Sequence, residues 1–223
     1  THATDVYPFV YLDPDQRALK FMANTYQNVS QNAFTKAQQD DYGLVQKAAY
    51  EKWRGASNYI TLMLLEEAFK EKRNTIVHGT TSTGPLAQPL VQGAKKAGYE
   101  IIFLLCSAPD EFRKKVIHYR NTEQRFYQST PEDAVSKGIM FPQRMQFFFE
   151  QGDTLYLYWS DSLSNAERLA AIFKAGKEIV VDVDAYAAFK EKYDSDAQHL
   201  DKEDIALSAW DALVDVYKKR FIA

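Results

Sequence analysis

Residues 9–15 read FVYLDPD, and residues 74–80 read NTIVHGT. Each stretch is a short run rich in β-branched or aromatic residues that changes abruptly to carboxylates, or to histidine, glycine and threonine. Runs of this kind, bounded by turn residues, predict buried strands. Ligands in α/β folds bind beyond the carboxyl ends of the strands, so both stretches predict an edge of a sheet that can hold a ligand.

Three further apolar runs complete a set of five predicted strands: Phe9–Leu12, Thr75–Val77, Ile101–Leu105, Leu155–Trp159 and Ile179–Val181. Helical patterns are predicted over residues 41–72, 86–97, 110–120, 131–150, 164–175 and 201–219. We expect interruptions at Gly55 and Pro142, and a helix end at Gly176. Strands that alternate with helices predict an α/β fold with a mostly parallel sheet of about five strands flanked by helices. The length predicts a single domain over residues 1–223.

Composition excludes several classes of protein. Lys and Arg number 27 against 30 Asp and Glu, so the formal net charge is −3, and no long basic run predicts a nucleic-acid partner. The single cysteine, Cys106, cannot form an intramolecular disulfide and is expected to be buried and inert. The four histidines show no metal-ligand spacing, so no metal site is predicted. No apolar run is long enough to cross a membrane and no signal peptide is evident, which predicts a cytoplasmic protein without a membrane partner.

Asp13 and Asp15 follow the first predicted strand directly. A carboxylate in this position can take a proton from a hydroxyl, or hold a magnesium ion through water. The alternative is a turn in which Asp15 caps a helix that starts near Gln16. Asp182 and Asp184 repeat the pattern after the last predicted strand, and there we favour the helix cap.

Haloacid dehalogenase-like phosphatases also begin with Asp-x-Asp after a strand. They require Thr or Val two residues after the second Asp, and this chain has Arg17 and Tyr186 at the two corresponding positions. The pattern therefore gives little support to the interpretation that the chain is such a phosphatase.

The turn after the second predicted strand reads HGTTSTG over residues 78–84. Backbone amides at the start of the following helix can hold an anion, although a capped turn explains the same residues. Arg120 and Arg125 lie where a predicted helix ends. Two guanidinium groups there can close over a polyphosphate, and the alternative is a solvated surface like that expected for Arg113 and Lys114.

Taken in order, these pieces resemble the zeta-toxin family of P-loop kinases over residues 8–160. The resemblance begins at FVYLDPD, and at NTIVHGT the family has an apolar strand followed by Glu-Gly-Thr. The other matching positions are Trp53, Ala68, Phe69, residues 95–100, Ala108, Pro109, Arg120, Arg125, Thr130 and Pro131.

The resemblance implies a P-loop-kinase-like fold and an enzyme that transfers the γ-phosphate of ATP, with Mg²⁺, to a hydroxyl of a nucleotide or nucleotide sugar. It makes Asp15 the general base and places Arg120 and Arg125 on the triphosphate. An inhibitory protein partner, as in a toxin–antitoxin pair, is implied as well. The implied substrate-binding residues are Asp13, Arg17, His78, Thr80 and Thr81.

Three departures from the family pattern qualify what the resemblance implies. No Gly-x-x-x-x-Gly-Lys-Ser/Thr occurs in the 223 residues, so this phosphate-binding loop, with its strand and helix, is expected outside them. His78 stands where the family has Glu, and the segment between Arg120 and Arg125 is shorter than in the toxins. The alternative is a catalytically inactive relative that binds a nucleotide or a partner protein.

Overall fold

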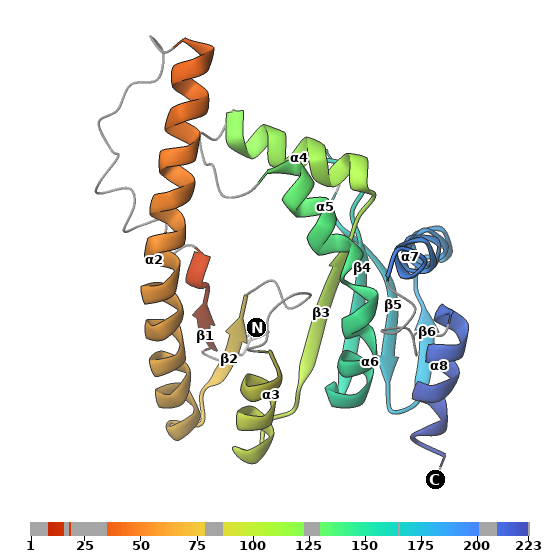
Figure 1. Cartoon of the computed structure of the whole chain (residues 1–223). Helices are drawn as coiled ribbons and strands as arrows, with labels where there is room; N and C mark the ends of the chain where they lie inside the picture. Colours follow the sequence, from red (N-terminus) through yellow and green to blue (C-terminus); the bar gives the residue numbers. More distant parts are fainter. Residues whose placement is uncertain are drawn as a thin grey trace, which may run out of the picture. The chain divides into compact units, whose positions relative to one another are not determined.

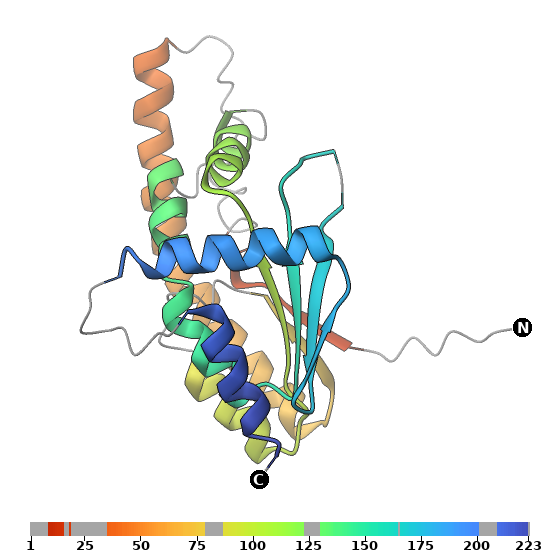
Figure 2. The same cartoon turned by 90° about the vertical axis from the view of Figure 1, so that its right-hand side faces the viewer.

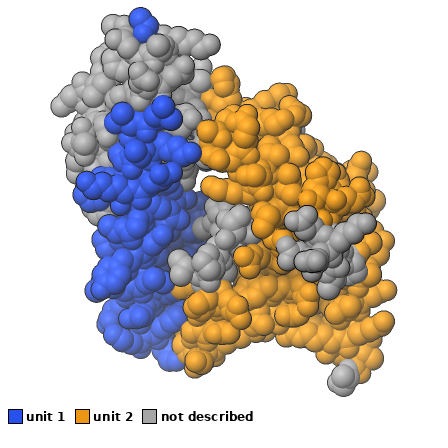
Figure 3. Space-filling view, in the orientation of Figure 1, with its two compact units in different colours: residues 1–80, 120–129 blue, residues 81–119, 130–223 orange. Residues whose placement is uncertain are grey.

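The computed structural model describes residues 9–15, 18, 35–78, 87–122, 130–164, 166–200 and 209–222. Helices and strands alternate along most of the chain, which confirms the α/β class. The contacts divide the chain into two compact units, coloured separately in Figure 3. Unit 1 comprises residues 1–80 and 120–129, and unit 2 comprises residues 81–119 and 130–223. The single-domain organisation stays a prediction.

Unit 1 contains a parallel pair of strands, β1 (Phe9–Leu12) and β2 (Asn74–Val77), which pack against the long helix α2 (Lys36–Lys70) (Figure 1). Both strands were predicted within one residue of their ends. The predicted interruption of the helix at Gly55 is wrong, because α2 continues through it. A single glycine costs a helix only about 1 kcal/mol relative to alanine, which the turns on either side of it offset.

Unit 2 contains a four-stranded sheet in the order β3 (Ile102–Ser107), β4 (Thr154–Trp159), β5 (Arg168–Lys174) and β6 (Lys177–Val180). Strands β3 and β4 are parallel, whereas β4–β5 and β5–β6 are antiparallel. This sheet is therefore mixed, where a mostly parallel sheet was expected.

The predicted helix over residues 164–175 is wrong, because most of this segment is β5. Its alanines favour a helix locally, but Ala170, Ala171 and Phe173 are fully buried in the sheet, and this packing decides the outcome. Gly176 is part of a hairpin turn instead of a helix end. Ala175 and Gly176 have φ values of 48° and 73°, the left-handed pair that a two-residue hairpin turn requires.

Helices cover unit 2 on the side of its aromatic core, and Figure 2 shows α7 crossing the sheet, where it packs on β4 and β5. The predicted interruption at Pro142 is confirmed, because one helix ends at Ile139 and the next begins at Pro142. The predicted cap is confirmed too: Asp182 Oδ1 accepts a hydrogen bond from the Ala185 amide at 2.9 Å. The helices are α3 (Ala87–Lys96), α4 (Asp110–Thr122), α5 (Pro131–Ile139), α6 (Pro142–Gln151), α7 (Val183–Ala197) and α8 (Trp210–Lys219).

None of the helices in the described part of the chain is long and apolar enough to cross a membrane.

Strand β3 exposes Ile102 and Leu104 on one face, while Leu105 and Ser107 on the other face are buried. Cys106 lies on the open face, and its expected burial is wrong. Successive side chains of a strand point to opposite faces, so the helices that bury Leu105 leave Cys106 accessible.

A polar network ties α8 to β6 and α7 beside the aromatic core of unit 2. Trp210 is fully buried and donates from Nε1 to Tyr186 Oη at 2.7 Å. Tyr186 in turn donates to Glu178 Oε1, and Lys218 Nζ donates to Glu178 Oε2, both at 2.5 Å. Burial raises the pKa of Glu178, but these two donors outweigh it and hold the pKa below its usual value of 4.5.

Replacing Glu178 with Gln is expected to lower the free energy of unfolding at pH 7 by about 1–2 kcal/mol, because a charge-assisted hydrogen bond is lost. The folded-state pKa lies below the unfolded one. The carboxylate's contribution is therefore complete above pH 4.5 and is lost as the pH falls through the folded value. Urea unfolding of both proteins should show the difference shrinking between pH 7 and pH 3.

The matched control for this prediction is Glu111→Gln, which breaks an exposed ion pair with Lys114. Solvent screens exposed pairs, so little change in the free energy of unfolding is expected at either pH. If Glu178→Gln lowers the free energy of unfolding equally at pH 7 and at pH 3, the assignment of a lowered pKa to Glu178 is contradicted.

Candidate active site

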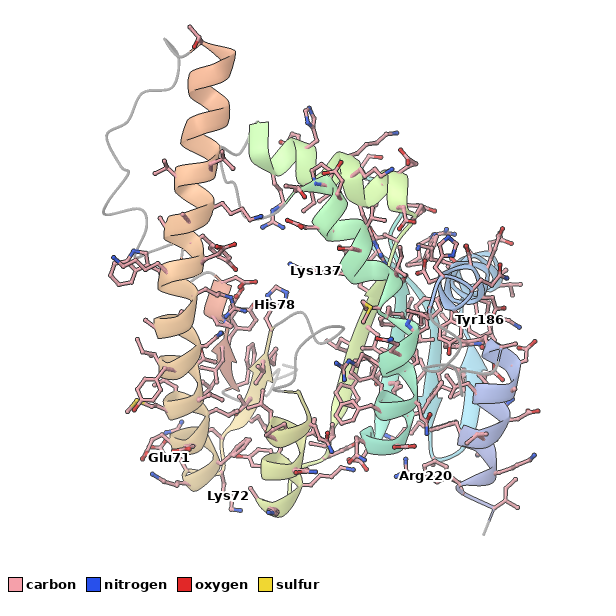
Figure 4. The ribbon with its side chains drawn as sticks, viewed as in Figure 1. Glu71, Lys72, His78, Lys137, Tyr186 and Arg220 are labelled. Carbon is pink, nitrogen blue, oxygen red and sulfur yellow. The ribbon has the colours of Figure 1, made fainter. Side chains whose placement is uncertain are left out.

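The candidate active site lies in unit 1, where parallel strands β1 and β2 end at the same edge. The two strands are paired up to Leu12 and Val77, and the His78 amide continues the ladder by donating to the Leu12 carbonyl at 2.9 Å. Asp13 and His78 are therefore neighbours just beyond the strands, and Figure 4 shows His78 at the end of β2.

Asp13 is the buried centre of this site, with a side chain only 6% exposed. Its Oδ2 lies 2.9 Å from His78 Nδ1 and accepts a hydrogen bond from the Tyr11 hydroxyl at 3.4 Å. Its Oδ1 accepts the backbone amide of Asp15 at 2.9 Å. Asp13 therefore closes the turn into the helical residues that follow, and this is the role that the capping alternative had given to Asp15.

Asp15 is held from α2. Its Oδ1 lies 2.5 Å from Arg54 Nε and accepts a hydrogen bond from the Tyr50 hydroxyl at 2.6 Å. Ser57 fixes the same turn by donating from Oγ to the Pro14 carbonyl at 2.5 Å. The Asp15 side chain is 23% exposed. The carboxylate is thus fixed through Oδ1 and is still partly accessible to a ligand.

The α2 residues of this site were not among the sequence-based candidates. Tyr50, Arg54, Ser57 and Thr61 lie on one helical face, and Tyr50, Ser57 and Thr61 are buried. Polar residues at spacings of four, three and four along a helix share a face, and this pattern is the signal that would have indicated them.

The other predicted site residues are distributed as follows. Arg120 lies near the end of α4 and is grouped with unit 1. Arg17, Thr80, Thr81 and Arg125 lie outside the described residues. Among the described residues, no three His, Cys, Asp or Glu side chains group together as metal ligands do.

Unit 2 contains a separate polar cluster at the carboxyl end of β3. Arg113, expected to be solvated, is mostly buried and donates from Nη2 to Ser107 Oγ at 3.2 Å. Lys192 lies 3.0 Å from Asp110 Oδ1 and also pairs with Asp196. A side chain at Gly138 would overlap the Arg113 guanidinium, with its Cβ 1.4 Å from Nη1. These contacts join β3, α4, α5 and α7, so the cluster has a structural role in the packing of unit 2.

The site in unit 1 combines three groups with distinct chemistry. Asp15 presents a carboxylate oxygen, a hard donor that can align a hydroxyl or hold Mg²⁺ through water. His78 presents an imidazole backed by a buried carboxylate. Partial burial and the adjacent Asp13 carboxylate raise the pKa of Tyr11, which keeps its hydroxyl a donor. The arrangement can orient a polar ligand and accept a proton.

A search of curated proteins finds no match to this chain. Among solved structures, a chain from the characterisation of the PezAT chromosomal toxin–antitoxin system of the human pathogen Streptococcus pneumoniae is similar. It is 12% identical, the alignment covers 98% of this chain and 87% of that one, and the TM-score is 0.47. A likeness at this level does not establish a shared fold or function.

The family comparison is decisive. A family model described as an AAA domain matches residues 16–141, which is more than half of the chain. The match runs from the residue after Asp15 through α2, β2, α3, β3 and α4 to the junction of α5 and α6. The chain therefore belongs to the AAA domain family.

Proposed function

We propose that the protein is an ATP-dependent kinase of the zeta-toxin type, which transfers a phosphoryl group to a hydroxyl of a nucleotide or nucleotide sugar. The observation that carries the proposal is the grouping of Asp13, Asp15 and His78 at the carboxyl ends of two parallel strands, in a member of the AAA domain family. Domains of this P-loop class bind a nucleoside triphosphate together with Mg²⁺.

The residues have separate roles in this proposal. Asp15, which Arg54 and Tyr50 hold through Oδ1, would align the acceptor hydroxyl, in the place that the resemblance gives to a general base. Arg120 and Arg125 would hold the triphosphate, whose charge ATP-bound Mg²⁺ reduces. Arg17, Thr80 and Thr81 would line the acceptor pocket beside His78.

The side chains of the described site fit such a reaction. Phosphoryl transfer depends mainly on positioning and on charge stabilisation, and Asp15 is fixed by two contacts from a single helix. The cofactor requirement is ATP with Mg²⁺. An inhibitory protein partner is part of the same proposal, and it rests on the resemblance to toxins.

The full-length protein, including any phosphate-binding loop outside residues 1–223, is expected to transfer label from γ-³²P-ATP to a component of a nucleotide and nucleotide-sugar mixture. Label transfer should require Mg²⁺ and should release one ADP for each phosphorylated product. Thin-layer separation and mass spectrometry of the labelled species identify the acceptor. Binding of ATP by calorimetry without any label transfer would contradict the kinase and support the inactive, nucleotide-binding relative.

A further inference from the structure

The contact between His78 and Asp13 fixes which nitrogen of the imidazole carries the proton. His78 Nδ1 lies 2.9 Å from Asp13 Oδ2, and the Asp13 side chain is almost completely buried. An ionised carboxylate only accepts hydrogen bonds, so Nδ1 must be the donor. In the neutral ring the other nitrogen, Nε2, then carries a lone pair and is a proton acceptor.

Neighbouring contacts hold this pair in place. Asp13 Oδ1 is fixed by the Asp15 amide, and Oδ2 also accepts the Tyr11 hydroxyl. The Tyr11 ring lies alongside the imidazole, with 6.4 Å between centroids and 27° between planes. The orientation of His78 is therefore set by contacts on one side of its ring.

The other side of the ring is accessible. The His78 side chain is 62% exposed, and its Nε2 makes no hydrogen bond to a described residue. It lies at the carboxyl end of β2, where ligands of α/β folds bind. Asp15 differs, because two donors from α2 already occupy its Oδ1. The two side chains thus suit different tasks: a tethered carboxylate aligns a hydroxyl, and an imidazole backed by a carboxylate takes its proton.

We propose that His78 Nε2 is the proton acceptor for the substrate hydroxyl, that Asp13 is its positioning residue, and that Asp15 aligns the hydroxyl. The inference rests on the kinase proposed above. The hydroxyl oxygen forms a bond to the γ-phosphorus of ATP, and the bond from that phosphorus to the bridging oxygen breaks. The electron pair of the broken bond leaves with ADP. The hydroxyl proton passes to Nε2 and then to solvent, which restores the neutral imidazole.

The first test is His78→Ala in the full-length protein, with turnover measured at saturating ATP. A general base contributes about 10²- to 10⁴-fold, so a loss of this size is expected. Adding free imidazole should restore part of the turnover in proportion to its concentration, because it can occupy the space left by the side chain. The control is His199→Ala, whose exposed ring lies 3.0 Å from the Ser195 carbonyl through Nδ1 and does not belong to the proposed site. It should keep full turnover and show no response to imidazole.

The second test examines Asp13 by nitrogen-15 NMR of the histidine rings. In the wild-type protein His78 should show a protonated Nδ1 and an unprotonated Nε2. Asp13→Asn should shift His78 toward the other tautomer and lower kcat with little change in the KM for ATP. A purely structural role of Asp13 would leave the tautomer unchanged in the folded variant.

The outcomes separate this inference from the function on which it rests. An active wild-type protein whose His78→Ala variant keeps its turnover, or loses it without imidazole rescue, would overturn the role of His78 and leave the kinase standing. A wild-type protein that transfers no phosphate would overturn both. Loss of turnover with rescue, together with the tautomer shift, supports the assignment.

Discussion

Lysine in place of Arg120 or Arg125 is expected to lower turnover by about 10³- to 10⁵-fold, nearly as much as alanine does, if these residues stabilise the transferring phosphoryl group. Guanidinium offers a planar fork of donors that matches phosphate oxygens, whereas ammonium is a compact point charge. Arg120 lies in the last turn of α4. Steady-state kinetics of the full-length variants measure the effect.

The control for the two arginines is Lys114→Ala, on the same helix α4 as Arg120. Lys114 forms a surface ion pair with Glu111 at 2.7 Å, and the Glu111 side chain is 77% exposed. Such an exposed pair contributes little to stability, and its loss should leave turnover unchanged. If Arg120→Lys and Arg125→Lys behave like this control, neither residue is on the triphosphate, and the resemblance fails at these positions.

The parts of the fold that follow local rules were predicted from the sequence. β1 is a β-branched and aromatic run closed by Asp-Pro-Asp, and its predicted range is the observed one. The boundary at Pro142 was predicted as well, because proline lacks the amide hydrogen that continues a helix. In both cases the decisive residues are adjacent in the chain.

β5 shows where local rules fail. Its alanines and the following glycine favour a helix with a stop, yet the segment pairs with β4 through residues nine to 20 positions away. Burial against the aromatic residues of unit 2 outweighs a difference in propensity of less than about 1 kcal/mol per residue. Cys106 was misjudged for a related reason: the face of β3 that is covered depends on where the helices pack.

The candidate site likewise contains residues that were predicted from local sequence and residues that were not. Asp13, Asp15 and His78 were predicted because each follows a strand directly. Tyr50 and Arg54 were not, because their contacts with Asp15 join residues 35 or more positions apart. The capping alternative for Asp15 failed on geometry: the side chain that accepts the turn amide is that of Asp13. Which of two neighbouring carboxylates closes a turn depends on the packing around both.

Asp15→Asn is expected to lower kcat by about 10²-fold or more and to leave the fold intact. The amide keeps the shape of the side chain, but it removes the charge that pairs with Arg54, and its NH₂ group cannot accept a hydrogen bond from a substrate hydroxyl. Misplacing a reacting group by about 1 Å can cost about 10²-fold. Turnover at saturating ATP, with circular dichroism to confirm folding, measures the change.

Asp161→Asn is the matched control, because it also removes an aspartate paired with an arginine. Asp161 lies beyond the end of β4 in unit 2, and its Oδ2 is 3.0 Å from Arg168 Nη2. Loss of an Asp–Arg pair affects stability in both variants, but only Asp15 belongs to the proposed site. Asp161→Asn should therefore keep wild-type kcat. Full activity of a folded Asp15→Asn would remove Asp15 from the mechanism, and equal losses in both variants would trace the effect to a broken ion pair instead of to the acceptor hydroxyl.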